Sequence, residues 1–534
     1  MEGNPTLGSY GKRQGWRILW YQPYFLRIAL TAAIGGIIYG YDSGIHGNCL
    51  LSVNEDLQHI TNTTDLHLIT PPISMLYMTL GIPTVGHLGS MIGRPHSILY
   101  SDLILILGAI VGATALNSVM FVLSRVVLGI GFGGILLASP IYLAEISPCG
   151  VRGALVSTFY LFVSGGQFLA YLMSKTLSSV PGTGTYRLML VLEGFLAIAQ
   201  FNLMNTLPES PPKLHRQDRE KAVILLNYLY SPHEAEKEIE TLESSLNGVK
   251  LETFFLTSDI LETLSRNISM SRGYVAGIGC MIAQQLVGIN FVMYYAPKLL
   301  KLDSIVLPGL SILGCLSNIC FVDTWGRRKV LLISIIGMAV SLWMLSHGLK
   351  EHTQVLDYDF LHNISFTRLL SPPNLESYMK ANVTLHMNSS TAYSGAMVRI
   401  GFLVEGKGSS NQGTSFHEKA DIFAWSGLYS YIIFYSFGMG TVPWIINSEI
   451  YPYNHRVCFA ALVSLWSIYS NFFVGFCMWF IFEALGPSNT FALLSVVTLA
   501  TSLFVFLLVP ETKGVRIEEI ESMMSAGKNK KETC

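Results

Sequence analysis

The segment EISPCGVR at residues 145–152 returns later in the chain as EIYPYNHR at residues 449–456. In both copies a glutamate opens the segment and an arginine closes it. Two further pairs of segments keep the same order along the chain: Gly93-Arg94 with Gly326-Arg327, and Pro208-Glu209-Ser210 with Pro510-Glu511-Thr512. Similar segments that recur in the same order indicate an internal repeat. The sequence therefore predicts two related halves joined by a central linker.

The composition indicates what kind of halves these are. Of 534 residues, 51% are hydrophobic and 13% are charged, and the mean hydropathy is +0.45. A formal net charge of -1 gives no sign of a nucleic-acid partner. The eight cysteines are scattered, without a disulfide framework or metal-ligand spacing, and the polar N-terminus does not read as a cleaved signal peptide. We expect an all-α polytopic membrane protein.

Twelve apolar blocks are each about long enough to cross a bilayer of roughly 30 Å at 1.5 Å per residue. The first six are Leu26–Leu50, Leu68–Leu88, Ile98–Ala115, Val119–Leu143, Leu155–Met173 and Leu188–Leu207. The last six are Gly273–Tyr295, Ile305–Val322, Val330–Leu349, Ile422–Ile446, Ala460–Phe482 and Phe491–Val509. The predicted halves are thus residues 1–207 and 272–534, with a charged linker of short helices at 208–271 and a long loop at about 350–421.

Basic residues predict the orientation of the spans. If the spans alternate, the basic clusters fall on one side, and the positive-inside rule places both termini in the cytoplasm. Four glycosylation sequons then face outward and a fifth, at Asn267, faces inward. The outward sequons are predicted glycosylation sites: Asn62, Asn363, Asn382 and Asn388. They imply the secretory pathway and hence the plasma membrane, with a vacuolar membrane as the alternative.

Three amides stand inside the otherwise apolar stretch MIAQQLVGINFVMYYAP at residues 281–297, namely Gln284, Gln285 and Asn290. Buried amides need partners, and they offer both donors and acceptors without charge. An uncharged, hydroxylated ligand would satisfy both, although hydrogen bonding between helices is the plainer alternative. On a straight helix Gln285 and Asn290 would point about 140° apart. They converge only if the helix bends or unwinds, which Gly288 permits.

Several motifs resemble those of the sugar porters of the major facilitator superfamily, and the resemblance covers nearly the whole chain. The motifs are PESP at residues 208–211, QQLVGIN at 284–290, VDTWGRR at 322–328 and PETKG at 510–514. The segments GYDSG at 40–44 and GMGTVPWIINSEIYP at 438–452 most resemble the proton-coupled myo-inositol transporters. The long outer loop resembles theirs as well.

This resemblance implies the major facilitator fold and no enzymatic activity. It implies secondary active transport of myo-inositol or a related neutral polyol or sugar, by proton symport and alternating access. No cofactor is expected, the proton is the expected coupling ion, and a monomer in membrane lipid is the expected transport unit. Two alternatives stay open, a hexose uniporter and a sugar or polyol sensor that binds without transporting.

The resemblance also implies roles for individual residues. Gln284, Gln285 and Asn290 match the family's substrate-binding amides, and Gln167 matches an amide of the fifth span. Trp444 matches the tryptophan that packs on the substrate ring, with an interfacial anchor as the alternative.

Ionisable residues inside the spans are costly unless paired, which favours an ion pair between Asp42 and Arg125. These two match the proton-coupling pair of proton-linked sugar porters, and Glu193 matches an acidic position of the bacterial xylose-proton symporter. A structural ion pair in a uniporter is the alternative for Asp42. Asp102 is a further acidic residue, for which an interfacial position near the start of the third span fits at least as well.

Charged residues on the cytoplasmic side match the clusters that link the two halves of these transporters. The predicted gate consists of Arg94, Glu145, Arg152, Arg327, Arg328, Glu449 and Arg456. The sequence also departs from the family pattern. Ser90 stands where an acidic residue is usual, Ser311 and Ser467-Ile468 replace expected site residues, and the connection from Pro297 to Ile305 is short.

Overall fold

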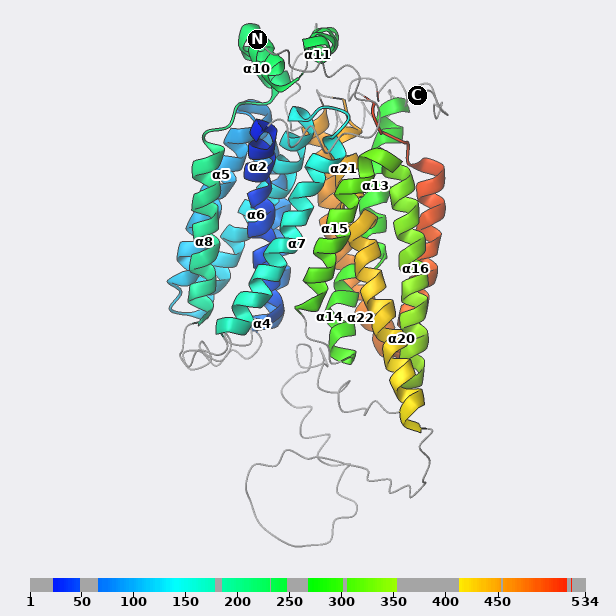
Figure 1. Ribbon diagram of the computed structural model, residues 1–534. Coiled ribbons are helices and arrows are strands. Elements are labelled where there is room, and N and C mark those ends of the chain that lie inside the picture. The colour runs from blue at the N-terminus through cyan, green and yellow to red at the C-terminus, as the bar shows by residue number, and fades with distance from the viewer. Residues whose placement is uncertain are drawn as a thin grey trace, which may run out of the picture.

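The computed structural model describes residues 23–48, 66–177, 185–230, 232–246, 268–300, 305–352, 413–452, 455–515 and 520. Within these ranges every regular element is a helix. The first group of long helices comprises α2 (Pro23–Asn48), α4 (Leu66–Met91), α5 (Arg94–Ala113), α6 (Ser118–Ile146), α7 (Arg152–Leu177) and α8 (Thr185–Met204). These helices lie side by side in one half of the bundle (Figure 1).

The second group of helices packs beside the first (Figure 1). It comprises α13 (Ile268–Leu286), α14 (Ile289–Leu299), α15 (Val306–Trp325), α16 (Arg327–His352), α20 (Gly413–Phe434), the π-helical turn η2 (Tyr435–Met439), α21 (Val442–Glu449) and α22 (Arg456–Leu508). Three short helices, α9 (Pro211–Gln217), α10 (Arg219–Leu229) and α11 (Pro232–Leu246), lie at one end of the bundle. At that same end α2 begins and α22 ends, as the predicted orientation requires.

Within the described residues, each of the twelve predicted apolar blocks falls largely on these helices, but three details differ from uninterrupted spans. The seventh block is divided between α13 and α14, and the tenth contains η2. The last two blocks share α22, whose 53 residues are interrupted at Gly486 with φ 74° and ψ 170°. In the described part of the chain, nine helices are long and apolar enough to cross a membrane.

The outer faces of the helices are apolar, as expected for contact with lipid. Leu107, Phe195 and Leu503 expose 59%, 64% and 61% of their surfaces. In water such a covering of large exposed hydrophobic side chains would promote association, whereas in a bilayer it is ordinary. Polar and charged side chains such as Asp42, Arg125 and Glu193 are buried inside the bundle instead.

Glycines let α2 approach the backbone of α7 closely. A Cβ atom at Gly36 would lie 2.3 Å from the carbonyl oxygen of Phe159, and one at Gly40 would lie 1.9 Å from that of Val163. The sequence predicts this role for the small residues at four-residue spacing in α2. Neither carbonyl is the end of a flexible side chain, so α2 can sit on α7 only without Cβ atoms here.

The substitution Gly40→Ala is expected to destabilise the protein, because its methyl group would overlap the backbone of α7. Overpacking of this kind costs typically about 1–3 kcal/mol, which thermal melting of the purified protein in detergent would detect. Gly165→Ala is the matched control, since a Cβ at Gly165 meets nothing within 4 Å. Equal melting temperatures for Gly40→Ala and wild type would contradict the packing argument.

Candidate functional site

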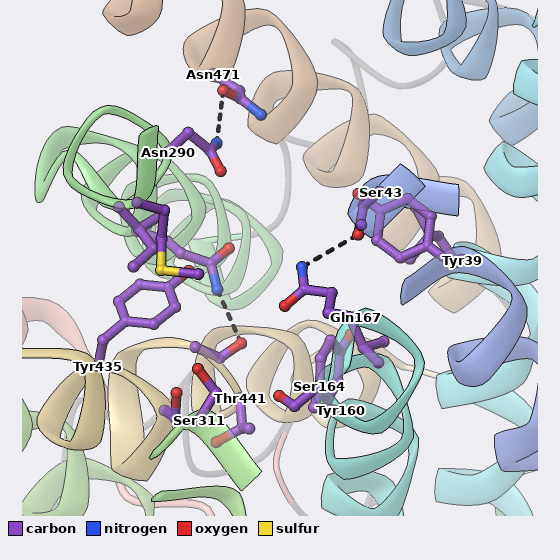
Figure 2. A pocket seen from close by; sticks show the side chains of 18 of the residues that line it. Tyr39, Ser43, Tyr160, Ser164, Gln167, Asn290, Ser311, Tyr435, Thr441 and Asn471 are labelled. Carbon is purple, nitrogen blue, oxygen red and sulfur yellow. Dashed lines mark hydrogen bonds between the residues drawn. The ribbon is translucent and has the colours of Figure 1, made fainter. Parts of the chain in front are cut away.

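A cavity of about 350 Å³ lies between the two groups of helices. Its lining includes Tyr39 and Ser43 of α2 and Gln167 of α7 on one side, and residues of α13, α14, α15, η2, α21 and α22 on the other. Figure 2 shows these side chains converging from both sides. The cavity is therefore built at the junction between the halves, where a relative movement of the helices would change access to it.

The break between α13 and α14 brings the three predicted amides to the same cavity. The two helices meet at Gly288, whose φ of 76° lies in the left-handed region that favours glycine. Gln284, Gln285 and Asn290 all line the cavity. The predicted unwinding at Gly288 is confirmed, and it removes the 140° divergence of a straight helix.

Hydrogen bonds hold each of these amides in place. Gln284 Nε2 donates to the carbonyl oxygens of Met439 and Gly440 at 2.9 and 3.0 Å. Gln285 Nε2 donates to Ser467 Oγ at 3.2 Å. Interhelical hydrogen bonding, the alternative weighed for these residues, thus occurs while the side chains still line the cavity. The two roles are compatible because an amide has more donors and acceptors than these contacts use.

Asn471 of α22 is a cavity residue that sequence reasoning missed. Its Oδ1 accepts a hydrogen bond from Asn290 Nδ2 at 2.9 Å (Figure 2). It lies four residues after Ser467, and residues four apart share a helix face. The family's amide is absent at Ser467, but an amide one turn further along α22 reaches the cavity. A search for polar residues at this spacing would have found it.

The opposite wall of the cavity comes from α2 and α7. Gln167 Nε2 donates to Ser43 Oγ at 3.1 Å. Trp444 lines the cavity, and its ring lies 5.9 Å from that of Tyr160, tilted by 33°. This contact joins α21 to α7 across the junction, so Trp444 is not an anchor at a lipid interface. Tyr160 was not expected from the sequence.

The predicted ion pair of the first half forms. Arg125 Nη1 lies 2.5 Å from Asp42 Oδ1, and the two side chains are 1% and 3% exposed. The ring of Phe121 lies 5.0 Å from the guanidinium carbon. Asp42 also lines the cavity. Glu193 is fully buried and interacts electrostatically with both members of the pair, so the three residues form one buried cluster of ionisable side chains.

The charged residues of the predicted gate join the two halves through Glu145. This buried carboxylate accepts hydrogen bonds from Arg94 Nη2 at 3.0 Å and from Arg456 Nη1 at 3.4 Å. Arg94 begins α5 and Arg456 begins α22, so the second contact crosses the junction. In the second half Arg327 Nη2 donates to Glu449 Oε1 at 3.0 Å. The repeated segments EISPCGVR and EIYPYNHR thus occupy equivalent positions.

Asp323 makes a second contact across the junction that was not among the predicted gate residues. Its carboxylate accepts backbone hydrogen bonds from Gly153 and Ala154 at 3.1 and 2.7 Å, at the start of α7. It also lies 2.8 Å from Arg327 Nη1. An anion at a helix N-terminus is favourable because unpaired N–H groups point toward it. The motif VDTWGRR carried the signal for this residue.

The counterpart of Asp323 in the first half is Ser90, which lies three residues before Gly93 as Asp323 lies three before Gly326. Ser90 Oγ donates to the carbonyl oxygen of His87 within its own helix, at 2.7 Å. It supplies no charge to the start of α22. The contacts that these two equivalent positions make are therefore asymmetric.

The other predicted gate residues differ in what they contact. Arg152 Nη1 donates to the carbonyl oxygen of Val515 at 3.4 Å and so also reaches the other half. Arg328 donates to the carbonyl oxygen of Phe506 and lies over the Phe506 ring at 5.1 Å. This places Arg328 against α22 of its own half, apart from the contacts that cross the junction.

Glu209 and Glu511 explain why the PES and PET segments recur. Glu209 Oε1 accepts from the backbone N–H of Arg94 at 3.1 Å, and Glu511 Oε1 accepts from that of Arg327 at 2.9 Å. Each glutamate therefore stabilises the start of a helix in its own half. Nearby, Lys213 Nζ donates to the carbonyl oxygen of Met91 at 2.8 Å, and burial lowers the pKa of Lys213.

Some predictions lie outside the described residues. The sequons at Asn62, Asn363, Asn382 and Asn388 fall there, as does most of the predicted outer loop. Ser311, where the family pattern has an asparagine, lies in the described part and lines the cavity. Ile468 is not part of the cavity lining.

A cavity that combines apolar and amide side chains lies between two groups of membrane-length helices, and the charged contacts gather at one end. This arrangement is typical of a membrane carrier. Comparison with known proteins makes the class specific. Residues 28–364 and 383–524 match the family described as "Sugar (and other) transporter". The chain belongs to this family, and the predicted family is confirmed.

Individual relatives agree with this family. The chain is 35% identical to "Probable inositol transporter 2" of Arabidopsis thaliana, over 98% of this chain and 96% of the relative. It is 28% identical to the "Proton myo-inositol cotransporter" of Homo sapiens, over 93% and 81%. A similar solved structure is that of the proton:xylose symporter XylE bound to 6-bromo-6-deoxy-D-glucose. The TM-score is 0.73 at 22% identity, covering 94% of this chain and 99% of that one. The fold is therefore that of the major facilitator superfamily, as predicted.

Proposed function

We propose that this protein transports myo-inositol or a related neutral polyol together with a proton, by alternating access. The observation that carries the proposal is the cavity at the junction, which combines uncharged amides with a buried ion pair in its wall. The amides suit a ligand with many hydroxyl groups and no charge. The relatives named as inositol transporters support the same substrate class.

In this proposal Gln284, Gln285, Asn290 and Gln167 hydrogen-bond the hydroxyl groups of the substrate, and Asn471 extends the set. Trp444 offers an indole face to the C–H groups of the substrate ring. A cyclitol has hydroxyl groups around its rim and C–H groups on its faces. Amides at the side of the ring and an aromatic face above it therefore match both parts of its surface.

Proton coupling is assigned to Asp42, with Arg125 and Glu193. Protonation of Asp42 would remove the negative partner of Arg125 in the cavity wall and weaken the ion pair. The halves, residues 1–207 and 272–534 with the linker 208–271 between them, would then rearrange around the substrate. The contacts of Glu145 and Asp323 across the junction would break as the cytoplasmic side opens and reform as it closes.

The remaining assignments follow the same reasoning. Outward sequons at Asn62, Asn363, Asn382 and Asn388 imply a glycosylated protein of the plasma membrane or the vacuolar membrane. One chain contains the whole cavity, so a monomer suffices for transport. The proton serves as the coupling ion.

Uptake by purified protein in liposomes tests the proposal. Labelled myo-inositol is expected to accumulate above its outside concentration when the outside is acidic, and labelled glucose to accumulate less. Collapse of the pH gradient with a protonophore should abolish accumulation. Equilibration without accumulation would indicate a uniporter instead, and binding without any uptake would indicate a sensor.

The substitution Asn471→Ala is expected to weaken substrate binding. Loss of one hydrogen bond to an uncharged group costs about 1 kcal/mol, which corresponds to about a fivefold higher KM. Ser470→Ala is the matched control, because Ser470 Oγ donates to the carbonyl oxygen of Trp466 in its own helix and does not line the cavity. An unchanged KM for Asn471→Ala would exclude this residue from the binding site.

A further inference from the structure

Asp102 is a buried carboxyl group that the proposed mechanism does not use. It lies eight residues after the start of α5 at Arg94, about 12 Å along the helix. Its side chain is fully buried within the protein. Neither carboxylate oxygen has a hydrogen-bond partner within the described residues.

The register between α5 and α8 identifies the residue that faces Asp102. A Cβ at Gly112 would lie 3.0 Å from Leu190 Cδ1, and a Cβ at Gly194 would lie 3.1 Å from Ala109 Cβ. Position numbers rise in one helix as they fall in the other, so the helices are antiparallel. Asp102 lies two turns from Ala109 on the same face. The same register sets Asp102 opposite Gln200.

Gln200 has the matching property. It too is fully buried, and neither its amide nitrogen nor its amide oxygen has a hydrogen-bond partner within the described residues. Its amide lies toward α2, where a Cβ at Gly35 would be 3.0 Å from Nε2. Four buried polar atoms without partners therefore occupy one layer between α2, α5 and α8. A carboxylic acid and an amide can satisfy each other, since the O–H donates to the amide oxygen and the amide N–H donates to the acid carbonyl.

Charged groups that could stabilise an ionised Asp102 lie at other levels of the bundle. On α6, Arg125 follows Ser124, and Ser124 faces Gly112 of α5. Gly112 lies ten residues, or about 15 Å along α5, from Asp102. Glu193 of α8 lies at the level of Ala109 of α5, and Arg187 of α8 lies still further from Asp102. The other groups lie toward the cytoplasmic end: Arg94 and His96 of α5, Glu145 of α6 and, about one turn from Asp102, His87 of α4. An isolated carboxylate in this layer would be costly, so a neutral acid is the favourable form.

We propose that Asp102 is a second proton-binding residue of this transporter, carrying its proton in the conformation described here and exchanging it during transport. The inference rests on the proton-coupled function proposed above. Asp102 and Gln200 lie between the level of the Asp42–Arg125 pair and the cytoplasmic charges. A proton released from the pair toward the cytoplasm crosses this layer. Asp102 gives its proton to the cytoplasmic side and regains one from the side of Glu193, while Gln200 holds the acid in position.

Infrared spectroscopy of the purified protein tests the proton without requiring transport. A protonated carboxylic acid has a C=O stretching band separate from that of a carboxylate. Asp102→Asn is expected to remove one such band, and Gln200→Leu to shift it by removing the polar side chain opposite the acid. Glu483→Gln is the control, because Glu483 is an exposed residue of α22, away from Asp102, and should leave the band of Asp102 in place. Retention of every protonated band in Asp102→Asn would overturn the proposal.

Transport measurements test whether Asp102 exchanges its proton during transport. Asp102→Asn preserves the shape of the side chain without a proton that can be exchanged, so a merely structural role would leave all activities unchanged. We expect exchange of labelled for unlabelled myo-inositol to persist, while accumulation driven by a pH gradient slows by about 100-fold, as for removal of a proton-transferring group. Accumulation equal to wild type would overturn the role in exchange. If wild-type protein itself accumulates nothing, the proposed function fails, while the infrared band still reports on Asp102.

Discussion

Asp42→Asn is expected to abolish accumulation of substrate against its gradient while leaving substrate exchange intact. Asparagine has nearly the shape of aspartate and can still accept a hydrogen bond from Arg125, but it cannot gain or lose a proton. The side chain at position 42 would then be uncharged at every pH, and a pH gradient could not change its protonation. The accumulation ratio of labelled myo-inositol should fall to about one, as for equilibration without coupling.

Two controls separate loss of coupling from loss of folding. Asp42→Asn leaves the Arg125 cation buried without its anionic partner, which costs about 3–5 kcal/mol when a buried pair is broken. The double variant Asp42→Asn with Arg125→Gln removes both charges and should recover thermal stability without recovering accumulation. Uphill uptake that survives in Asp42→Asn would rule out Asp42 as the coupling residue.

Asp323→Asn is expected to shift the conformational equilibrium toward the state with an open cytoplasmic side. Asp323 accepts two backbone N–H groups of α7 and lies beside Arg327, so its charge favours the closed state across the junction. Loss of charge-assisted hydrogen bonds costs about 2 kcal/mol, which changes the ratio of the two states by about 30-fold. Spin labels at Asn205→Cys and Lys329→Cys, one in each half at the cytoplasmic end, would report the separation of the halves.

Asp218→Asn is the matched control for this experiment. Asp218 also accepts a backbone hydrogen bond at a helix start, from Lys221 at 3.2 Å, but it does so within the short cytoplasmic helices. It should leave the label separation unchanged. An identical distribution of separations in Asp323→Asn and wild type would show that this contact does not control the closure.

Ser90→Asp is expected to have the opposite effect. It would place a carboxylate at the position equivalent to Asp323, facing the start of α22. The same labels should then report a larger closed population, and turnover should slow because opening becomes harder. If Ser90→Asp leaves the closed population and the turnover rate unchanged, the two halves do not use their equivalent loops in the same way.

Much of the fold could be predicted from the sequence. The apolar blocks determine where helices form, and the repeated charged segments determine how the halves correspond. Glycine at position 288 also predicted the break between α13 and α14, because an amide on each side of it had to reach one site. The gap between the eleventh and twelfth blocks, residues 483–490, likewise contains Gly486, where the left-handed conformation interrupts α22.

Site residues could be predicted where burying an unpaired charged side chain in a membrane is costly. They could not be predicted where the role depends on the direction in which a side chain points. Asp42 and Arg125 had to pair, and they do. Arg327 and Arg328 could not be distinguished, yet neighbours on a helix point about 100° apart, so one faces Glu449 and the other faces α22. The burial of Asp102 could not be predicted either, because it depends on which side chains of other helices pack against this face of α5.

The hydrogen bonds of Gln284 restrict which functional group of a ligand ring can lie against this side chain. Both hydrogens of its amide group are already donated, to the carbonyl oxygens of Met439 and Gly440. Its oxygen accepts from Gln285 Nε2 at 3.5 Å and has a second lone pair for a ligand. An amide oxygen can only accept. A hydroxyl group satisfies it, whereas a ketone or a methyl ether at the same ring position cannot. The pocket should therefore discriminate between a cyclitol and its oxidised or O-methylated derivatives by the direction of a single hydrogen bond.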